Sequence, residues 1–317
     1  MEEHPRTLRE FEANFSTDSA CRDYLFQLRW PGGFVCPRCG KHGGWMAKSG
    51  RMICRGCRSG TTVTAGTIFQ DSHQPLTVWF RAMWWMTNQK TGLSGLGLQR
   101  LLGLGSYRTA WMMLHKLCSA MVRPGRDRLT GTIEVDEAYV GGLEEGLRGR
   151  GTEKKAVMVV AAQEDGQGIG RIRMAHVGDA SAASLHSFLE ASVEPGSTVH
   201  TDDWRGYRGV QAKGYRHIVT PIKKSGKPAH EILPRVHKVV SLFKRWLLGT
   251  HQGAISHEHL GSYLNEFVFR FNRRTSAHRG KLFLRLVQQA VAVEPVPYVH
   301  LVKGVRQGRS RNHNMLG

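Results

Sequence analysis

Four cysteines in two closely spaced pairs constrain this chain more than any other feature. Two residues separate Cys36 from Cys39 and Cys54 from Cys57, and fourteen residues lie between the pairs. Each pair forms a tight knuckle that presents two thiolates to one side, and two knuckles complete a tetrahedral Zn²⁺ site. Four thiolates leave no open position on the metal, so the spacing predicts a structural zinc ribbon. An iron–sulfur centre or a redox pair is the alternative.

The residues around these cysteines extend the prediction. We expect "TTVTAGTIF" at 61–69 to supply the β-hairpin of the ribbon. Cys21 and Cys118 lie in apolar helical settings and are expected to be buried thiols. A ribbon that only braces a small domain is the alternative to one that contacts DNA. Basic residues favour DNA contact, and those near the cysteines are Arg38, Lys41, Lys48, Arg51, Arg55 and Arg58.

The charge of the whole chain points to a polyanionic partner. The formal net charge is +20, and 40% of the residues are hydrophobic, which supports a real core. Nucleic acid is the commonest polyanion that such a protein meets, and a merely solvated basic surface is the alternative. No apolar run has the length of a membrane span, and the N-terminus lacks an apolar signal core. We therefore expect a soluble, cytoplasmic, nucleoid-associated protein without a membrane partner.

Patterns along the chain predict five segments. Residues 1–32 read as a helical lead-in with a break at 16–19, and 33–70 as the zinc ribbon. Residues 71–126 look helical. A domain at 131–290 shows three strands, a helix, two further strands and then helices, which predicts an α/β fold. Residues 291–317 form a basic tail, expected to be disordered at its end.

The helical segment contains a candidate DNA-recognition motif. "LSGLGLQRLLGLGSYRTAWMMLHKL" predicts two helices joined by a turn at 103–106, which is the layout of a helix-turn-helix. Tyr107, Arg108 and Thr109 would then begin the second helix, where base edges are usually reached. A plain helical hairpin is the alternative.

Two aspartates at predicted strands form a candidate catalytic centre. Asp136 interrupts the strand "IEVDEAYV", on the same face as Glu134, and Asp202 ends the strand "STVHTD". An aspartate within a strand is costly without a partner or a metal. Two carboxylates on neighbouring strands can hold Mg²⁺, and two such ions can activate a water and stabilise the leaving oxygen at a phosphodiester. This combination in a basic chain predicts a polynucleotidyl transferase of RNase H-like fold.

Five segments together resemble one family. They are "FVCPRCG", "TTVTAGTIFQDSHQPLTVWFRAMWWM", "EVDEAYVGG", "HTDDWRGY" and "HKVVSLFKRWLLGTHQGAISHEHLGSYLNEFVFRFNRR". On these segments the chain resembles bacterial insertion-sequence transposases of the ISXO2-like group, which join a zinc ribbon to a DDE-type core. The resemblance implies an RNase H-like catalytic domain at 131–290. It also implies Mg²⁺- or Mn²⁺-dependent cleavage and strand transfer of double-stranded DNA at the element's ends, by a homo-oligomer on DNA.

The resemblance assigns roles to single residues. The family's first two acids fall on Asp136 and Asp202, and Asp203 is then expected to cap the next helix or to face solvent. The family places Glu, Asn or another polar residue third, followed by a lysine seven residues later. His237 and Lys244 hold these positions here, and Glu231 is the alternative third ligand. Because His carries no negative charge, such a site would bind Mg²⁺ more weakly.

The last helix carries the family's Glu-Arg-Arg pattern at Glu266, Arg270 and Arg273. The resemblance places this pattern near the active site, where the arginines would contact phosphate; a structural salt bridge is the alternative. Two other functions remain open from the sequence. One is a DNA-binding protein with a decayed nuclease core, suggested by the missing third acid, and the other is a host nuclease of the same fold.

Overall fold

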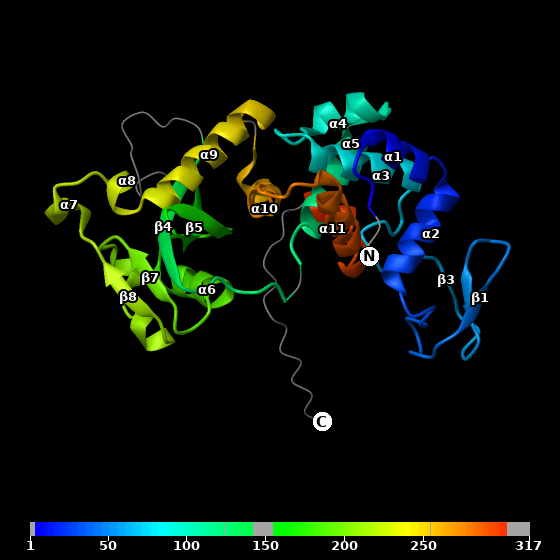
Figure 1. Ribbon diagram of the computed structural model, residues 1–317, viewed down its shortest axis with the longest axis horizontal. Coiled ribbons are helices and arrows are strands. Elements are labelled where there is room, and N and C mark those ends of the chain that lie inside the picture. Colours follow the sequence, from blue (N-terminus) through cyan, green and yellow to red (C-terminus); the bar gives the residue numbers. More distant parts are fainter. Residues whose placement is uncertain (1–3, 124, 142–154, 254, 303–317) are drawn as a thin grey trace.

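Helices of the N-terminal half lie beside a mixed β-sheet in the computed structural model (Figure 1). The structure describes residues 4–123, 125–141, 155–253 and 255–302, so the predicted disordered end of the basic tail lies outside the described residues. Within these ranges no helix combines the length and the apolar character needed to cross a membrane.

The helical lead-in breaks where the sequence predicts. Helix α1 spans Leu8–Asn14 and α2 spans Asp18–Arg29. The hydroxyl of Thr7 accepts a hydrogen bond from the N–H of Glu10, and that of Thr17 accepts one from the N–H of Ala20. These side chains satisfy N–H groups that a helix start leaves without partners, and they fix both starts.

The small zinc-ribbon sheet departs from the prediction. Strands β1 (Gly44–Met46) and β2 (Met52–Cys54) form an antiparallel hairpin between the two knuckles, and only Gly60–Thr61 adds a third strand, β3. The predicted hairpin at 61–69 is therefore wrong, because residues 62–70 form turns. Local hydrogen bonds hold these turns: the Thr62 hydroxyl accepts from the N–H of Ala65, and the Thr67 hydroxyl donates to the carbonyl of Thr64. Threonines that bond their own backbone favour turns over strands.

Three helices follow in the order expected. They are α3 (Leu76–Asn88), α4 (Gly95–Leu102) and α5 (Tyr107–Ala120). Gly103 ends α4 with φ of +63°, a left-handed conformation that glycine adopts at little cost. The two helices and their short turn confirm the layout predicted for 95–120.

A five-stranded sheet forms the second half. Its strands are β4 (Thr132–Val140), β5 (Ala156–Asp165), β6 (Gly168–Val177), β7 (Thr198–Thr201) and β8 (Arg216–Val219). The order across the sheet is β6-β5-β4-β7-β8. β5 pairs antiparallel with both neighbours, whereas β4, β7 and β8 pair in parallel. This order and these directions are those of an RNase H-like sheet, so the predicted fold class is confirmed.

Helices cover both faces of this sheet. Helix α6 (Ala182–Ser192), capped by Ser181, packs on one face, while α9 (Pro234–His251) and α10 (Leu260–Phe271) pack on the other. Figure 1 shows α9 across β4 and β5 and α6 on the opposite side. Short elements make the connections: η2 (Arg205–Tyr207), η3 (Val210–Lys213), α7 (Ile222–Ser225), α8 (Ala229–Ile232), η4 (His257–His259) and α12 (Tyr298–Val302).

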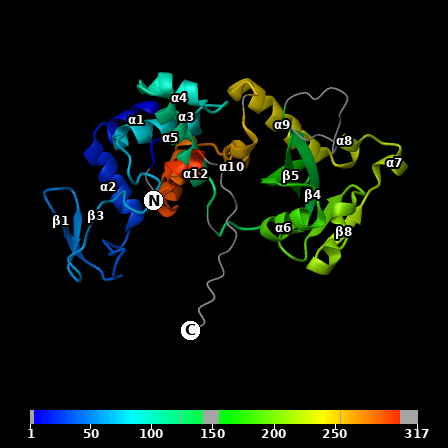
Figure 2. The same ribbon diagram turned by 180° about the vertical axis from the view of Figure 1, so that it is seen from behind.

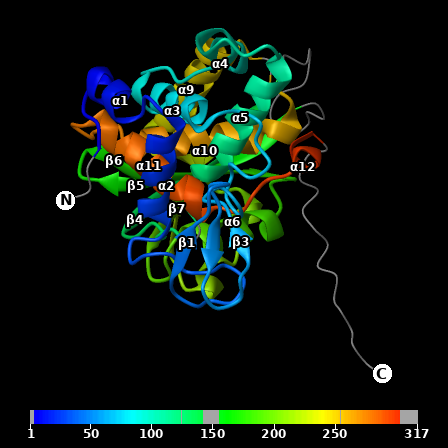
Figure 3. The same ribbon diagram turned by 90° about the vertical axis from the view of Figure 1, so that its right-hand side faces the viewer.

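One hydrophobic core runs from the N-terminal helices to the sheet. Helix α11 (Arg279–Ala292) packs on α2, α3 and α5, and α10 packs on both α5 and β6. Phe283 of α11 lies within 5.8 Å of the rings of Phe11, Phe15, Phe80 and Trp84. In the end-on view of Figure 3 the N-terminal helices lie over α10 and α11. The last long helix of the chain therefore completes the N-terminal core.

Candidate active site

The strand register brings the two predicted aspartates together. β4 and β7 pair in parallel with Ile133 opposite Val199 and Glu134 opposite His200. The same offset carried two residues further places Asp136 opposite Asp202. Neighbouring strands lie about 4.8 Å apart, so this extrapolated register is compatible with the predicted site of two carboxyl groups at the carboxyl end of β7.

The two adjacent aspartates after β7 have different environments. Asp202 is half-buried, and its Oδ1 accepts a hydrogen bond from the backbone N–H of Trp204 at 2.9 Å. Asp203 is exposed, as expected for a residue outside the site. Asp202 itself therefore makes the turn that follows the strand, and this bond fixes its side chain beside β4.

His237 completes the group from helix α9. Its Nε2 lies 3.6 Å from Oδ2 of Asp136, and that nitrogen is buried with no hydrogen-bond partner among the described residues. Burial lowers the pKa of His237, and the neighbouring His230 lowers it further, so the ring is neutral at pH 7. A neutral imidazole has a lone pair to offer a metal. The alternative ligand Glu231 is exposed on the short helix α8.

Glu134 sets the position of α9 against the sheet. Its carboxylate accepts hydrogen bonds from the backbone N–H groups of Arg235 (2.7 Å) and Val236 (3.0 Å), and a further one from the Arg235 guanidinium at 2.9 Å. No side chain of the helix itself caps this end, and only 3% of Glu134 is exposed. Glu134 therefore caps α9 from β4. Sequence reasoning placed Glu134 on the Asp136 face but assigned it no role; a second acid on that face was the available signal.

A buried pair on the opposite face ties β4 to the segment after Asp202. The hydroxyl of Tyr207 donates to Oε2 of Glu137 at 3.1 Å, and both side chains are buried. Burial raises the pKa of Tyr207 well above its usual range, and the charges of Glu137, Asp136 and Asp202 raise it further. Nothing in the sequence indicates this pair beyond a Glu next to Asp136 and a Tyr in the second motif.

Lys244 lies two helical turns after His237 on α9. The side chain is exposed, but partial desolvation lowers the pKa of its ammonium, and the charge of Lys155 lowers it further. Lys244 lines a cavity of about 370 Å³ together with Tyr139, Leu248 and His257. None of Asp136, Asp202 and His237 lines this cavity, so the expected role of Lys244 at the site stays a prediction.

The donor set of this site fits a hard divalent cation. Asp136 and Asp202 offer carboxylate oxygens, and His237 offers the unpartnered Nε2. Among the residues that the structure describes, only the four cysteines form a group of three or more ligands whose atoms all lie within 4.8 Å of one another. The Asp136, Asp202 and His237 side chains are thus less tightly gathered than the cysteines.

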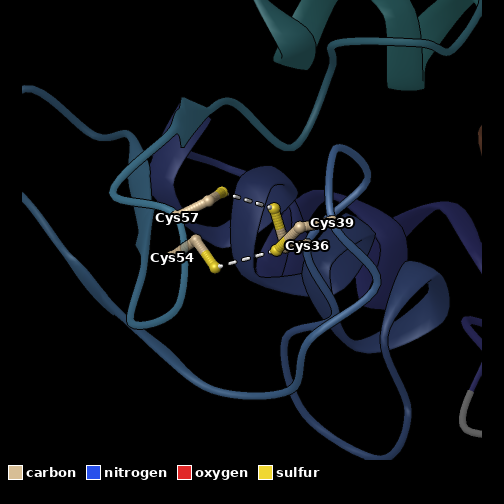
Figure 4. Close-up of side chains that lie close together, drawn as sticks. All are labelled: Cys36, Cys39, Cys54 and Cys57. Atoms are coloured by element: carbon tan, nitrogen blue, oxygen red, sulfur yellow. Dashed lines mark hydrogen bonds between the residues drawn. The ribbon is translucent and has the colours of Figure 1, made fainter.

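The cysteine cluster has the dimensions of a zinc site. The Sγ atoms of Cys36 and Cys57 lie 3.7 Å apart, as do those of Cys39 and Cys54 (Figure 4). A tetrahedron with Zn–S bonds of about 2.3 Å has sulfur atoms about 3.8 Å apart. The backbone N–H of Cys57, and less strongly that of Gly56, lowers the pKa of Cys54 to about 6. The four thiols fit the structural metal that their spacing predicts.

The Glu-Arg-Arg pattern on α10 makes contacts with the N-terminal helices. Oε1 of Glu266 lies 3.9 Å from Nη1 of Arg270, and the Arg270 guanidinium donates to the carbonyls of Met86, Gln89 and Lys90 at the end of α3. Arg273 stacks on Phe269 at 4.0 Å. These contacts favour the alternative of a structural ion pair between Glu266 and Arg270, which joins α10 to the N-terminal helices. The expected place of the pattern near the active site stays a prediction.

The helix-turn-helix residues lie on an open surface. Tyr107 and Arg108 are exposed, and Thr109 is partly exposed, at the start of α5. The Arg108 guanidinium lies 4.1 Å from the ring centre of Tyr298 on α12. Figure 2 shows α12 beside the N-terminal helices. The basic residues around the zinc cluster are likewise exposed.

Comparisons with known proteins agree with the two parts of the fold. Residues 16–59 match the transposase zinc-ribbon domain, and residues 128–272 match the ISXO2-like transposase domain. The chain is 28% identical over 284 residues to an uncharacterized protein in transposable element ISH50 of Halobacterium salinarum, covering 81% of this chain and 91% of that protein. Because this relative is archaeal, the bacterial origin expected from the sequence stays a prediction.

Among solved structures, the catalytic core domain of BIV integrase matches with a TM-score of 0.32 and 10% identity. That match covers 49% of this chain and 94% of that core domain. The fold assignment rests on the strand order described above.

Proposed function

The chain belongs to the ISXO2-like transposases with a transposase zinc ribbon, and from this we propose that it cuts DNA at the ends of a mobile element and joins them to a target. The observation that supports the proposal is the parallel register of β4 and β7, with Glu134 opposite His200, because the same offset two residues further would set Asp136 opposite Asp202. A bound divalent ion there would supply charge stabilisation at a phosphodiester and activate the attacking hydroxyl.

The proposed function assigns a separate role to each residue of the site. Asp136 and Asp202 would hold the ions through carboxylate oxygens, and His237 would contribute Nε2 to the same shell. Glu134 keeps α9, and with it His237, in place beside β4. Lys244 would contact a DNA phosphate from the same helix as a cation. Residues 131–290 would act as the catalytic domain, and Tyr107, Arg108 and Thr109 would read the element's ends.

The decisive experiment compares three variants on a labelled duplex that carries one element end. Asp136→Asn and Asp202→Asn should each abolish metal-dependent cleavage, while DNA binding stays intact or becomes slightly stronger because negative charge near phosphate is removed. The neighbouring Asp203→Asn provides the matched control and should keep most activity, since Asp203 is exposed.

The same assay separates the competing functions. A wild-type chain that binds the end but never nicks it with Mg²⁺ or Mn²⁺ would be a DNA-binding protein with a decayed core. One that nicks but never joins the end to a second duplex would be a nuclease. Full activity in both Asp136→Asn and Asp202→Asn would exclude a DDE-type site altogether.

A further inference from the structure

A cavity lined by arginines lies outside the aspartate site. It has a volume of about 560 Å³ and opens where the segment 121–127, strand β6, the end of α10 and helix α11 meet. Figure 1 shows α10 and α11 between the sheet and the N-terminal helices. Six arginines line the cavity: Arg123, Arg126, Arg171, Arg173, Arg273 and Arg285.

The protein holds several of these guanidinium groups in fixed positions. Arg173 is only 5% exposed and donates to the carbonyls of Ile172 and Asp127. Arg171 donates to the carbonyl of Arg128 at 3.2 Å. Arg273 donates to the carbonyl of Phe269 at 3.1 Å. Such anchoring lowers the entropy cost of binding a ligand, because the donors are already oriented.

The cavity carries far more positive than negative charge. Of the described residues that line it, Asp127 alone is acidic, and its carboxylate is largely exposed and 3.4 Å from Arg123. Burial, and after it the charges of Arg126 and Arg171, lower the pKa of Arg173 to about 10. Nε of Arg173 is buried without a hydrogen-bond partner among the described residues. Like charges gathered in this way destabilise a fold unless an anion joins them.

The position of the cavity separates it from the aspartates. Asp136 pairs with Val160 on β5, and Val160 pairs with Met174 on β6, so two strand spacings of about 4.8 Å each lie between Asp136 and the β6 edge. Arg173 points to the opposite face from Met174, since neighbouring side chains alternate along a strand. None of Asp136, Asp202 and His237 lines the cavity, so a group bound there by Arg173 is separate from the phosphate that Asp136 and Asp202 would act on.

We propose that this cavity binds backbone phosphates of DNA at a stretch away from the phosphodiester that is cut. The inference rests on the proposal that the chain acts on DNA. Guanidinium groups match phosphate oxygens with paired hydrogen bonds, and the cavity is large enough for more than one phosphate. The cavity would bind the duplex where the sheet meets the N-terminal helices. Helices α10 and α11 would then contact DNA in addition to packing in the hydrophobic core.

The test measures binding of a random-sequence duplex in EDTA, where no chemistry occurs. The pocket variant combines Arg126→Gln and Arg285→Gln, and the control combines Arg9→Gln and Arg216→Gln, which remove the same charge from exposed positions elsewhere. The pocket variant should lose about 10-fold or more in affinity at ~0.1 M salt. The slope of log affinity against log salt should fall by about 1.8, which is ~0.9 for each phosphate that the variant no longer neutralises. The control should change the slope by less than about 0.5.

Several outcomes would overturn the inference. One is an equal loss of slope in both double variants, and another is an unchanged slope in the pocket variant. ATP serves as a second probe, for free polyphosphate. If ATP raised the melting temperature of the wild type but not of the pocket variant, and DNA did not compete with it, the cavity would be assigned to a nucleotide instead. Should Arg126→Gln prevent folding, Arg123→Gln with Arg285→Gln replaces it, because both side chains are exposed. Since binding is measured without metal, failure of cleavage would refute the proposed function and leave this result standing.

Discussion

Nε2 of His237 on α9 lies 3.6 Å from Oδ2 of Asp136 on β4. The sequence separates these residues by a hundred positions, and the capping of α9 by Glu134 is what brings them together. The contact favours His237 over Glu231 as the third ligand, because Glu231 is exposed on α8.

We expect His237→Ala to lower Mg²⁺-dependent cleavage by roughly 10-fold or more, because a metal ligand is lost. His237→Glu should keep or raise the Mg²⁺ rate, since it restores an anionic oxygen ligand. Mn²⁺ should support the wild-type chain better than Mg²⁺, because it accepts nitrogen ligands more readily. Glu231→Gln is the matched control and should leave the rate unchanged. A dead Glu231→Gln variant beside an active His237→Ala variant would reverse the assignment.

Glu134→Gln should lower the free energy of unfolding by about 2–3 kcal/mol, because charge-assisted hydrogen bonds to the start of α9 are weakened. Urea denaturation measures this change. Glu164→Gln is the control: Glu164 also binds Arg235, at 2.7 Å, but its side chain is 40% exposed. It should cost less than about 1 kcal/mol, as exposed ion pairs do. Equal costs for the two variants would show that Glu134 does not anchor the helix.

Local patterns were enough to predict much of this fold. Period-two alternation predicted β4 and the face shared by Glu134 and Asp136, and knuckle spacing predicted the cysteine cluster. The break at 16–19 was likewise predicted from residues close together in the sequence. Each of these signals depends on residues a few positions apart, so a single sequence carries it.

Contacts between residues far apart in the sequence could not be predicted from local patterns. Glu266 and Arg270 share a helix face, as predicted, but nothing local says that this face meets α3 and α5 rather than the aspartates. The role of Glu134 likewise depends on a helix that begins a hundred residues later. The ribbon hairpin was misplaced because the β-branched residues at 61–69 were taken to indicate strands. The hydroxyl groups of Thr62 and Thr67 instead form local hydrogen bonds with the backbone, which favour turns.

The zinc prediction is tested by the metal content of the purified chain. Wild-type protein should hold about one zinc ion per chain, and Cys39→Ser should lose it and unfold the β1–β2 hairpin, which has little core of its own. Cys21→Ala changes a buried thiol outside the cluster and should retain the metal. Full zinc retention in Cys39→Ser would rule out the four-cysteine site.

The recognition role of α5 predicts a loss of specificity. Arg108→Ala should weaken binding to the element's end by about 1–3 kcal/mol and should change binding to random duplex much less. Competition binding between the two duplexes measures the difference. Arg9→Ala removes an exposed charge from α1 and should change binding to the two duplexes little and to the same extent. If Arg108→Ala also weakened both equally, Arg108 would contact phosphate rather than bases.

Glu266 predicts a pH-dependent stability that a difference measurement can isolate. Burial raises the pKa of this fully buried carboxyl to about 7, although Arg270 opposes the rise. Its folded pKa exceeds its unfolded value of about 4.5, so the neutral form is favoured in the folded chain. The stabilisation is therefore complete below pH ~4.5 and is lost as the pH rises to ~7, at a cost of about 3 kcal/mol.

Buried histidines change stability in the opposite direction, so the wild-type curve alone is not enough. Burial lowers the pKa of His115 to about 3 and that of His251 to about 4, so their contribution is lost as the pH falls below ~6.5. Urea unfolding of wild type and Glu266→Gln between pH 4.5 and 7.5 removes this shared contribution. The wild type should lose about 3 kcal/mol relative to Glu266→Gln across that range. Glu258 is exposed, so the curve of unfolding free energy against pH for Glu258→Gln should run parallel to the wild-type curve. A difference curve that stays flat would mean that Glu266 titrates normally in the folded chain.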